Sequence, residues 1–552
     1  MVASTVPETE LTAATGLRAG HGCLETSAPG PGAACADEAG AFQRLDWPSM
    51  RTMTPDGEAA NAPGDVLDTP EAGSLAIRGS GVRALGYVVG SLLTLASAPL
   101  LVRHLGVVDF GRYFTVVSLV ALVAGITDVG LATVALREFS ARTGADRDDF
   151  MRQVLGARVA LTILGVLGAT GFAAAAGYGN ELVLGTFVAG VGLLLTVVGH
   201  TYSIPLFVHL RIGRLTAVDV AIRAVGVALV LGLIILSAGI LEFIATAVVT
   251  SALALVATLA MTRGQVPLRP SLRTGELREL MRATLPLAVA TVLGSLYTKV
   301  VIIIMSVSAS DLITGYFGTA ARVIEVGVGI PFTLVATTFP IFARAATNDP
   351  ERFRYVLQRV LEIAVILGLW MTIVTVLGAD FMSSVLVTDP SQAAPVAQVL
   401  RVLAPMLTLV FLSLTTQTAL IALHAHRQLL IINATALAAI IVLTLLLVPL
   451  FAQVGGGCAV IAGEAVLFIT STAFLLRERP DVRLDLRPLP GILLAGAVAS
   501  AAVLLPVPAL VRLLAATVAF FGTLALVGGI PAEVRQAYRR GPSAATAAVS
   551  GP

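Results

Sequence analysis

Residues 429–450 read LLIINATALAAIIVLTLLLVPL, a run of 22 residues that contains no charged side chain. A helix of that length rises about 33 Å, and about 20 apolar residues suffice to cross the hydrocarbon core of a bilayer. Thirteen other stretches of the chain share this apolar character, so the pattern predicts an all-α integral membrane protein with about fourteen transmembrane helices. The predicted spans are 80–102, 113–136, 153–176, 182–208, 220–239, 243–262, 285–307, 312–342, 360–378, 403–423, 429–450, 458–476, 490–507 and 509–530.

The composition of the chain excludes an ordinary soluble enzyme. Of its 552 residues, 56% are hydrophobic and 13% are charged, and the mean hydropathy is +0.90. Soluble domains contain about 25% charged residues. The sequence also shows no glycine-rich phosphate loop, zinc-ligand spacing or nucleophile motif. We therefore predict no enzymatic activity, no metal and no cofactor.

The arginines are distributed unevenly between the two sides of the predicted bundle. Connections on the same side as residues 78–83 hold 27 arginines, whereas the alternate connections hold four: Arg103, Arg112, Arg401 and Arg512. Positively charged residues favour the cytoplasmic side of a membrane. We therefore predict a multi-pass protein of the inner (cytoplasmic) membrane with both termini in the cytoplasm.

The ends of the chain differ in composition from the membrane-spanning part. Residues 1–77 hold eleven acidic residues and three arginines, a composition typical of disordered segments. The predicted organisation is a disordered acidic cytoplasmic tail (1–77), a first lobe of six helices (78–262), a cytoplasmic inter-lobe linker (263–284), a second lobe of six helices (285–476), two C-terminal helices (477–530) and a cytoplasmic tail (531–552).

The predicted outward connections are short. The longest, at 379–400, has about 22 residues. Membrane polymerases and ligases that act on lipid-linked sugars usually carry a large outward catalytic loop. Its absence from this prediction disfavours a role in glycan synthesis.

Two short motifs recur at an offset of about 203 residues. The segment 109–114 (DFGRYF) parallels 311–317 (DLITGYF), and 150–155 (FMRQVL) parallels 353–357 (FRYVL). Both matches follow the same spans of each predicted lobe. Because each repeat holds an even number of helices, the two lobes should be pseudo-symmetric about an axis along the membrane normal. Repeats of this kind are typical of transporters, whose substrate path lies between the halves.

Several motifs resemble those of a known family. Residues 105–113 (LGVVDFGRY) are similar to the turn between the first two helices of polysaccharide-biosynthesis (Wzx-type) oligosaccharide flippases, and 127–131 (TDVGL) is similar to the end of their second helix. Three short segments resemble their eighth helix: Gly315-Tyr316, Ala320-Ala321-Arg322 and Phe339-Pro340. The family belongs to the multidrug/oligosaccharidyl-lipid/polysaccharide exporter superfamily.

This resemblance implies two six-helix lobes around a central cationic cavity, and transfer of undecaprenyl-diphosphate-linked glycans to the outer leaflet. The chain departs from the family at one position. Many relatives carry an acidic residue just after the middle of the seventh helix, where this chain reads YTKVV at 297–301. Ion coupling through an acid on that helix is therefore not carried over.

Five ionisable residues inside the predicted spans stand out by their depth, since a charge there costs about 2.5–3.5 kcal/mol on insertion scales. Lys299, Arg322 and Glu325 lie at similar depths on neighbouring helices, and Glu325 follows Arg322 by three residues, which allows the two to pair. One net positive charge then remains for a lipid diphosphate, so we predict these three as substrate-binding residues. A purely structural ion network is the alternative. Asp128 and Glu464 are candidates for ion coupling, or for hydrogen bonds to neighbouring helices.

Together these features predict a flippase that moves a polyprenyl-diphosphate-linked oligosaccharide from the cytoplasmic to the outer leaflet for cell-surface polysaccharide biosynthesis. Its expected partners are the lipid-linked glycan, the bilayer and, as further candidates, glycan-assembly proteins; no nucleic-acid partner is expected. Three alternatives stay open: a flippase for the lipid-linked peptidoglycan precursor, an ion-coupled exporter of small molecules or drugs, and a membrane assembly protein without transport. A drug exporter should line its cavity with carboxylates, whereas this sequence offers Lys299 and Arg322.

Overall fold

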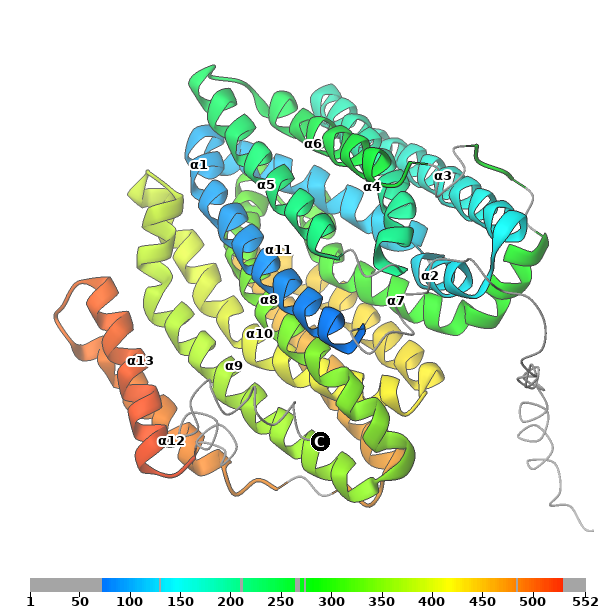
Figure 1. The fold of residues 1–552 in the computed structure, drawn as a ribbon. Helices are drawn as coiled ribbons and strands as arrows, with labels where there is room; N and C mark the ends of the chain where they lie inside the picture. Colours follow the sequence, from blue (N-terminus) through cyan, green and yellow to red (C-terminus); the bar gives the residue numbers. More distant parts are fainter. Residues whose placement is uncertain are drawn as a thin grey trace, which may run out of the picture. The chain divides into compact units, whose positions relative to one another are not determined.

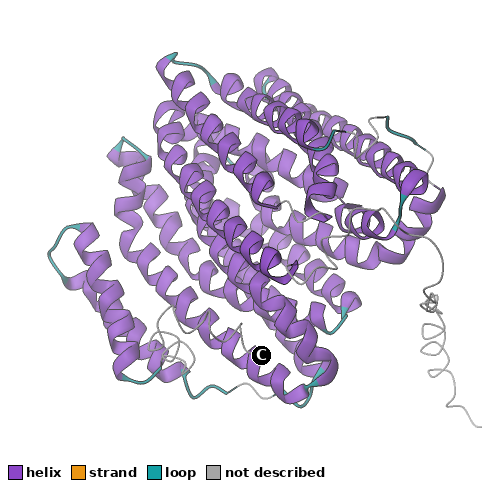
Figure 2. Cartoon of the chain, viewed as in Figure 1, coloured by secondary structure: helices purple, strands orange, loops and turns teal. Residues whose placement is uncertain are grey.

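The computed structural model describes residues 72–128, 131–208, 212–263, 269–272, 275–482 and 485–529 (Figure 1). Within these ranges all the regular elements are helices (Figure 2). They are α1 (Ala72–Asp128), α2 (Leu131–Ala141), α3 (Gly144–Ala175), α4 (Asn180–Val208), α5 (Ile212–Ile235), α6 (Ile240–Met261), α7 (Gly275–Ser308), α8 (Asp311–Asn348), α9 (Pro350–Leu386), α10 (Pro390–Ala422), α11 (His426–Glu478), α12 (Leu489–Ser500), a 3-10 turn (Ala501–Leu504) and α13 (Ala509–Leu526).

The two longest helices each contain two predicted spans joined at a kink. In α1 the kink is at Gly106, whose φ of +77° favours glycine. In α11 it is at Ala452, whose φ of +50° is unusual for a residue with a side chain. When the arms of α1 and α11 are counted separately, most of the predicted spans fall on one helix each, while the span 113–136 extends from α1 into α2 and the span 490–507 runs past α12. The prediction of an all-α membrane protein with about fourteen spans is confirmed, and ten of the helices are individually long and apolar enough to cross a membrane.

The helices form two lobes and a peripheral hairpin. In the first lobe, α4 packs between α3 and α6, and α5 packs on α1. In the second lobe, α10 packs against α8, α9 and α11. The α12–α13 hairpin lies beside α9 (red and yellow-green in Figure 1), where Trp370 Nε1 donates a hydrogen bond to Thr517 at 3.2 Å. Contacts of α1 with α7 and α8 join the lobes.

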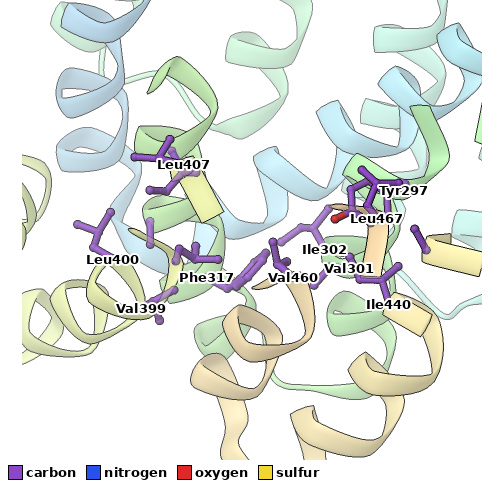
Figure 3. Close-up of a cluster of buried hydrophobic side chains, with 14 of the residues drawn as sticks. Tyr297, Val301, Ile302, Phe317, Val399, Leu400, Leu407, Ile440, Val460 and Leu467 are labelled. Atoms are coloured by element: carbon purple, nitrogen blue, oxygen red, sulfur yellow. The ribbon is translucent and has the colours of Figure 1, made fainter. Parts of the chain in front are cut away.

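The core of the second lobe is built from aliphatic and aromatic side chains of α7, α8, α10 and α11 (Figure 3). Helix α7 contributes Tyr297 and, about one turn later, Val301 and Ile302. They are buried in the same cluster as Ile440 and Val460 of α11. Because lipid tails are as apolar as these side chains, the association of the helices rests on close packing. This packing fixes α7, which holds Lys299, against the rest of the lobe.

The two copies of the repeated motif touch each other. A Cβ atom built on Gly111 of α1 would lie 2.6 Å from the Cα atom of Gly315 of α8, and one built on Gly315 would lie 2.3 Å from the carbonyl oxygen of Val107. Such distances are shorter than a side chain tolerates, so both positions require glycine. The predicted internal repeat therefore corresponds to a direct contact between the lobes.

The predicted outward loop at 379–400 is wrong in extent. Helix α9 continues to Leu386 and α10 begins at Pro390, which leaves three residues between them. Asp389 begins α10 because its carboxylate accepts a hydrogen bond from the backbone N–H of Ser391 at 2.9 Å, and Pro390 suits the first helical turn. Contacts with Ser391 lower the pKa of Asp389. The predicted tails at 1–77 and 531–552 lie outside the described residues, except that α1 begins at Ala72.

Candidate functional site

Three charged residues predicted from the sequence meet at one place. Lys299 lies on α7, and Arg322 and Glu325 lie one turn apart on α8. One carboxylate oxygen of Glu325 accepts a hydrogen bond from the Lys299 ammonium, and the other accepts one from Arg322 Nη1 at 3.1 Å. The sequence predicts the Arg322–Glu325 pair, and the structure adds Lys299 to it. With two positive charges and one negative charge, these three residues, the cationic cluster, carry a net charge of +1.

The cationic cluster is half-buried and faces the first lobe. The side chain of Lys299 is 20% exposed, and those of Arg322 and Glu325 are each 31% exposed. The Lys299 ammonium lies 5.6 Å from the centroid of the Phe114 ring of α1, within the range of a cation–π interaction. Partial burial strengthens the interaction of such a cluster with another charge. The cluster therefore lies where α1, α7 and α8 meet.

A cavity of about 200 Å³ adjoins the cationic cluster. Lys299, Glu325 and Tyr297 line it from the second lobe, and Phe114 and Ser118 line it from α1. Ser118 is fully buried, and its hydroxyl has no hydrogen-bond partner among the described residues. Much of the remaining wall is apolar and belongs to the core in Figure 3. The sequence gives no signal for Ser118 or Tyr297, because isolated hydroxyl groups are frequent in membrane helices.

Glu464, a candidate for ion coupling, is buried behind this cavity. Its carboxylate on α11 accepts a hydrogen bond from the Tyr297 hydroxyl at 2.7 Å and another from the Ser413 hydroxyl of α10. Its side chain therefore joins three helices of the second lobe. These contacts are the ones expected if Glu464 forms hydrogen bonds to neighbouring helices. Tyr297, which binds Glu464, is itself part of the cavity wall.

Asp128, the other candidate, is paired inside the first lobe. Its carboxylate accepts a hydrogen bond from Arg158 Nη2 at 2.7 Å, and Arg158 Nη1 donates to Thr201 at 3.1 Å. The side chain of Arg158 is 4% exposed. The arginine count assigns Arg158 to a cytoplasmic connection, and this is wrong because α3 begins at Gly144, about four turns earlier. Asp128 does not meet the cationic cluster.

The lobes are joined by a second set of charges, at the end of the bundle that holds the α1 kink. Arg112 of α1 forms an ion pair with Asp311 at 2.7 Å and another with Asp109 at 3.1 Å. Hydrogen bonding to Asp311 raises the pKa of Arg112 above its usual value. We call these three residues, together with Gly111 and Gly315, the outer seal, since the predicted topology places this end outside. It closes the contact between α1 and α8 at this end.

Comparisons with known proteins agree with this arrangement. The sequence model of a family described as polysaccharide biosynthesis protein matches residues 76–346. A search of curated proteins found no match.

Among solved structures, the chain is similar to the lipid II flippase MurJ in an inward closed conformation (12% identity, 81% of this chain and 98% of that one, TM-score 0.67). It is also similar to an inward-facing multidrug resistance MATE family transporter of the MOP superfamily (15% identity, 72% and 94%, TM-score 0.54) and to a MOP superfamily transporter from Pyrococcus furiosus (16% identity, 77% and 99%, TM-score 0.55). At these identities the similarity concerns the fold. Residues 76–346 of the chain match the polysaccharide biosynthesis protein family, and the chain has the fold of the MOP superfamily transporters.

Proposed function

We propose that the protein is a flippase that moves a polyprenyl-diphosphate-linked oligosaccharide from the cytoplasmic to the outer leaflet of the inner membrane, for cell-surface polysaccharide biosynthesis. In this proposal both termini are cytoplasmic and no bond is made or broken. Family membership and fold support transport of this kind. The observation that carries the proposal is the net positive charge of the cationic cluster on a cavity whose wall both lobes share.

A diphosphate that enters a half-buried cavity loses much of its hydration, so it needs a cation there. Coulomb attraction between two charges is several-fold stronger at the effective dielectric of a protein than in bulk water. Glu325 neutralises one of the two positive charges in the cluster. Lys299 and Arg322 share Glu325, so one positive charge of the pair is available to phosphate oxygens, and Lys299 presents it on the cavity wall.

The alternatives differ in what they require of this site. A flippase for the peptidoglycan precursor would use the same diphosphate chemistry, and the MurJ-like fold is compatible with it. An exporter of cationic drugs requires a negative cavity, and the net charge of the cationic cluster disfavours the cavity beside it as the site for such a drug. A membrane assembly protein without transport would not depend on the charge of Lys299.

The test of the proposal is removal of the Lys299 charge. We expect Lys299→Met to abolish surface glycan while insertion and protein level stay normal, and Lys299→Arg to retain part of the activity because guanidinium also binds phosphate. Loss of one partner from a desolvated charge pair weakens binding by about 2 kcal/mol or more, roughly 30-fold. Binding of undecaprenyl diphosphate to the purified protein measures this. Arg401→Ala, which removes an ion pair with Asp380 on the α9–α10 end, is the matched control.

A triple variant separates ligand binding from a structural role. Removing Lys299 and Glu325 together is uninformative, because Arg322 would be left unpaired and could replace the missing cation. Lys299→Met with Arg322→Met and Glu325→Gln removes all three charges and keeps similar volumes, a change that is often neutral for stability. We expect this variant to fold and to bind no undecaprenyl diphosphate. Glycan export by the triple variant would contradict the proposal and leave the cluster as a structural network.

A further inference from the structure

The first lobe contains a separate cavity of about 660 Å³. It lies among α1, α2, α3, α4, α5 and α6, and its volume is within the range of small-molecule binding sites. The cationic cluster is not part of its wall. Its charged and titratable lining residues are Asp128, Arg158, His200 and Asp219, and its hydroxyl-bearing lining residues are Thr127, Thr196, Ser203, Thr250, Ser251 and Thr258.

This first-lobe cavity offers a hydrogen-bond donor that the protein leaves unused. The guanidinium of Arg158 is held by Asp128 and Thr201, yet its Nε–H has no partner among the described residues. The side chain is 4% exposed. A buried N–H without an acceptor destabilises the folded protein, and a ligand oxygen would offset this cost if a side-chain movement exposed the Nε–H to the cavity.

The hydroxyl groups on the wall act mainly as acceptors. Thr127 donates to the Val123 carbonyl at 2.9 Å, and Thr250 donates to the Thr246 carbonyl at 2.8 Å. Each hydroxyl has one donor and two lone pairs. Since the donor is used within the helix, the oxygen can accept a hydrogen bond from a ligand. The wall therefore combines hydroxyl and carboxylate acceptors with a guanidinium donor.

The charge of the first-lobe cavity distinguishes it from the cationic cluster. Asp128 neutralises Arg158, and Asp219 adds a second carboxylate. With His200 neutral, the lining has no net positive charge, so it does not suit a diphosphate. A neutral polyhydroxyl compound, which needs donors and acceptors side by side, fits this lining better.

We infer that the first-lobe cavity binds sugar units of the transported glycan, while the cationic cluster binds the diphosphate. This inference rests on the proposed function. The second arm of α1 is a wall of both sites, because Ser118 lines the cavity at the cluster and Asp128 lines the first-lobe cavity. Ten residues of helix separate them, about 15 Å. That span is comparable with the length of a short oligosaccharide.

The experiment compares two lipids on the purified full-length protein. One is undecaprenyl diphosphate, and the other is the lipid-linked glycan extracted from the membranes of the producing organism. The variants are His200→Ala and the pair Thr196→Val with Ser251→Ala, whose hydroxyls are hydrogen-bonded to each other at 2.8 Å across α4 and α6. They leave the Asp128–Arg158 pair intact, so they avoid loss of folding. Thr170→Val, whose hydroxyl donates to its own helix on α3 at 2.8 Å, is the matched control.

We expect wild type and Thr170→Val to bind the lipid-linked glycan at least about tenfold more tightly than undecaprenyl diphosphate, because the sugar hydroxyls add hydrogen bonds to the cavity wall. The cavity variants should lose this preference and keep their affinity for undecaprenyl diphosphate. Lys299→Met should lose both ligands.

Four results would overturn the inference. If wild type binds both lipids equally, the glycan makes no contact here, and the proposed function still stands. If the cavity variants lose both lipids to the same extent, the cavity has a structural role. If tetraphenylphosphonium binds wild type and is lost in Asp128→Asn, the cavity is a cation site. If wild type binds neither lipid, the proposed function fails as well.

Discussion

The carboxylate of Glu464 accepts hydrogen bonds from Tyr297 and Ser413 and is buried among three helices. We expect Glu464→Gln to keep most transport activity, because an amide of the same size can accept a hydrogen bond from one hydroxyl and donate one to the oxygen of the other. Glu464→Ala should lower thermal stability by about 1–3 kcal/mol for each hydroxyl that it leaves unpaired. Thermal unfolding of the purified variants and surface glycan in cells measure the two effects. Loss of transport in Glu464→Gln at unchanged stability would instead assign an ion-coupling role to this residue.

The sequence identifies the charged residues of the site but not its uncharged polar residues. Lys299, Glu325 and Glu464 are recognisable because a charge inside an apolar run is costly and therefore conspicuous. Ser118 carries no such signal, and its position on the cavity wall follows only from how α1 packs. Arg158 is misleading in the sequence, because it lies near a predicted cytoplasmic helix end. The excess of arginine on the cytoplasmic side is then enough to account for it, and no binding role is indicated.

Between elements, the contact of Gly111 on α1 with Gly315 on α8 makes a specific prediction. A methyl group at residue 315 would lie 2.3 Å from the carbonyl oxygen of Val107, so α1 and α8 must separate to admit it. We expect Gly315→Ala to shift the protein away from the conformation in which the outer seal is closed. Labelling of Ser118→Cys by a membrane-impermeant thiol reagent, in a variant without the three native cysteines, should rise several-fold.

The matched control for this change is Gly168→Ala on α3, where an added Cβ has nothing within 4 Å. Equal labelling in Gly315→Ala and Gly168→Ala would show that the glycine contact does not hold the lobes together. The internal repeat is visible in the sequence, but the contact between Gly111 and Gly315 is not. The pattern of apolar residues gives the order of the helices and not the distances between them. Likewise the Gly106 kink has a glycine at the kink itself, whereas the kink at Ala452 is indicated only by Pro449, three residues earlier in the helix.

For the whole molecule, the arginine distribution predicts the orientation in the membrane. Reporters fused after residues 150, 275 and 484 should be cytoplasmic, and reporters fused near residues 310 and 390 should be outside. The structure is compatible with this alternation, since residues 310 and 390 lie at turns between consecutive helices, α7–α8 and α9–α10. Alkaline phosphatase and green fluorescent protein fusions provide the measurement. A cytoplasmic reporter at residue 390 would invert or break the topology.

The number and order of helices follow from the sequence because apolar length is a strong constraint in a bilayer. Helix ends do not. The helices α9 and α10 extend well beyond their apolar runs, because polar ends such as Asp380 and Ser391 remain helical where the chain leaves the hydrocarbon core. The first-lobe cavity could not be predicted from the sequence either, because the residues that line it come from six separate helices.

The arginine of the outer seal has a consequence for how such a protein descends from a duplicated gene. Asp109 and Asp311 occupy equivalent places in the two repeats, and both are bound by Arg112 of the first repeat. Because Arg112 lies where the two halves meet, it can pair with the aspartate of each half. A second arginine at the equivalent position of the other half is therefore not needed, and that position can change. Divergence between the ancestral halves is therefore tolerated even where they touch, provided that one of them keeps the shared residue.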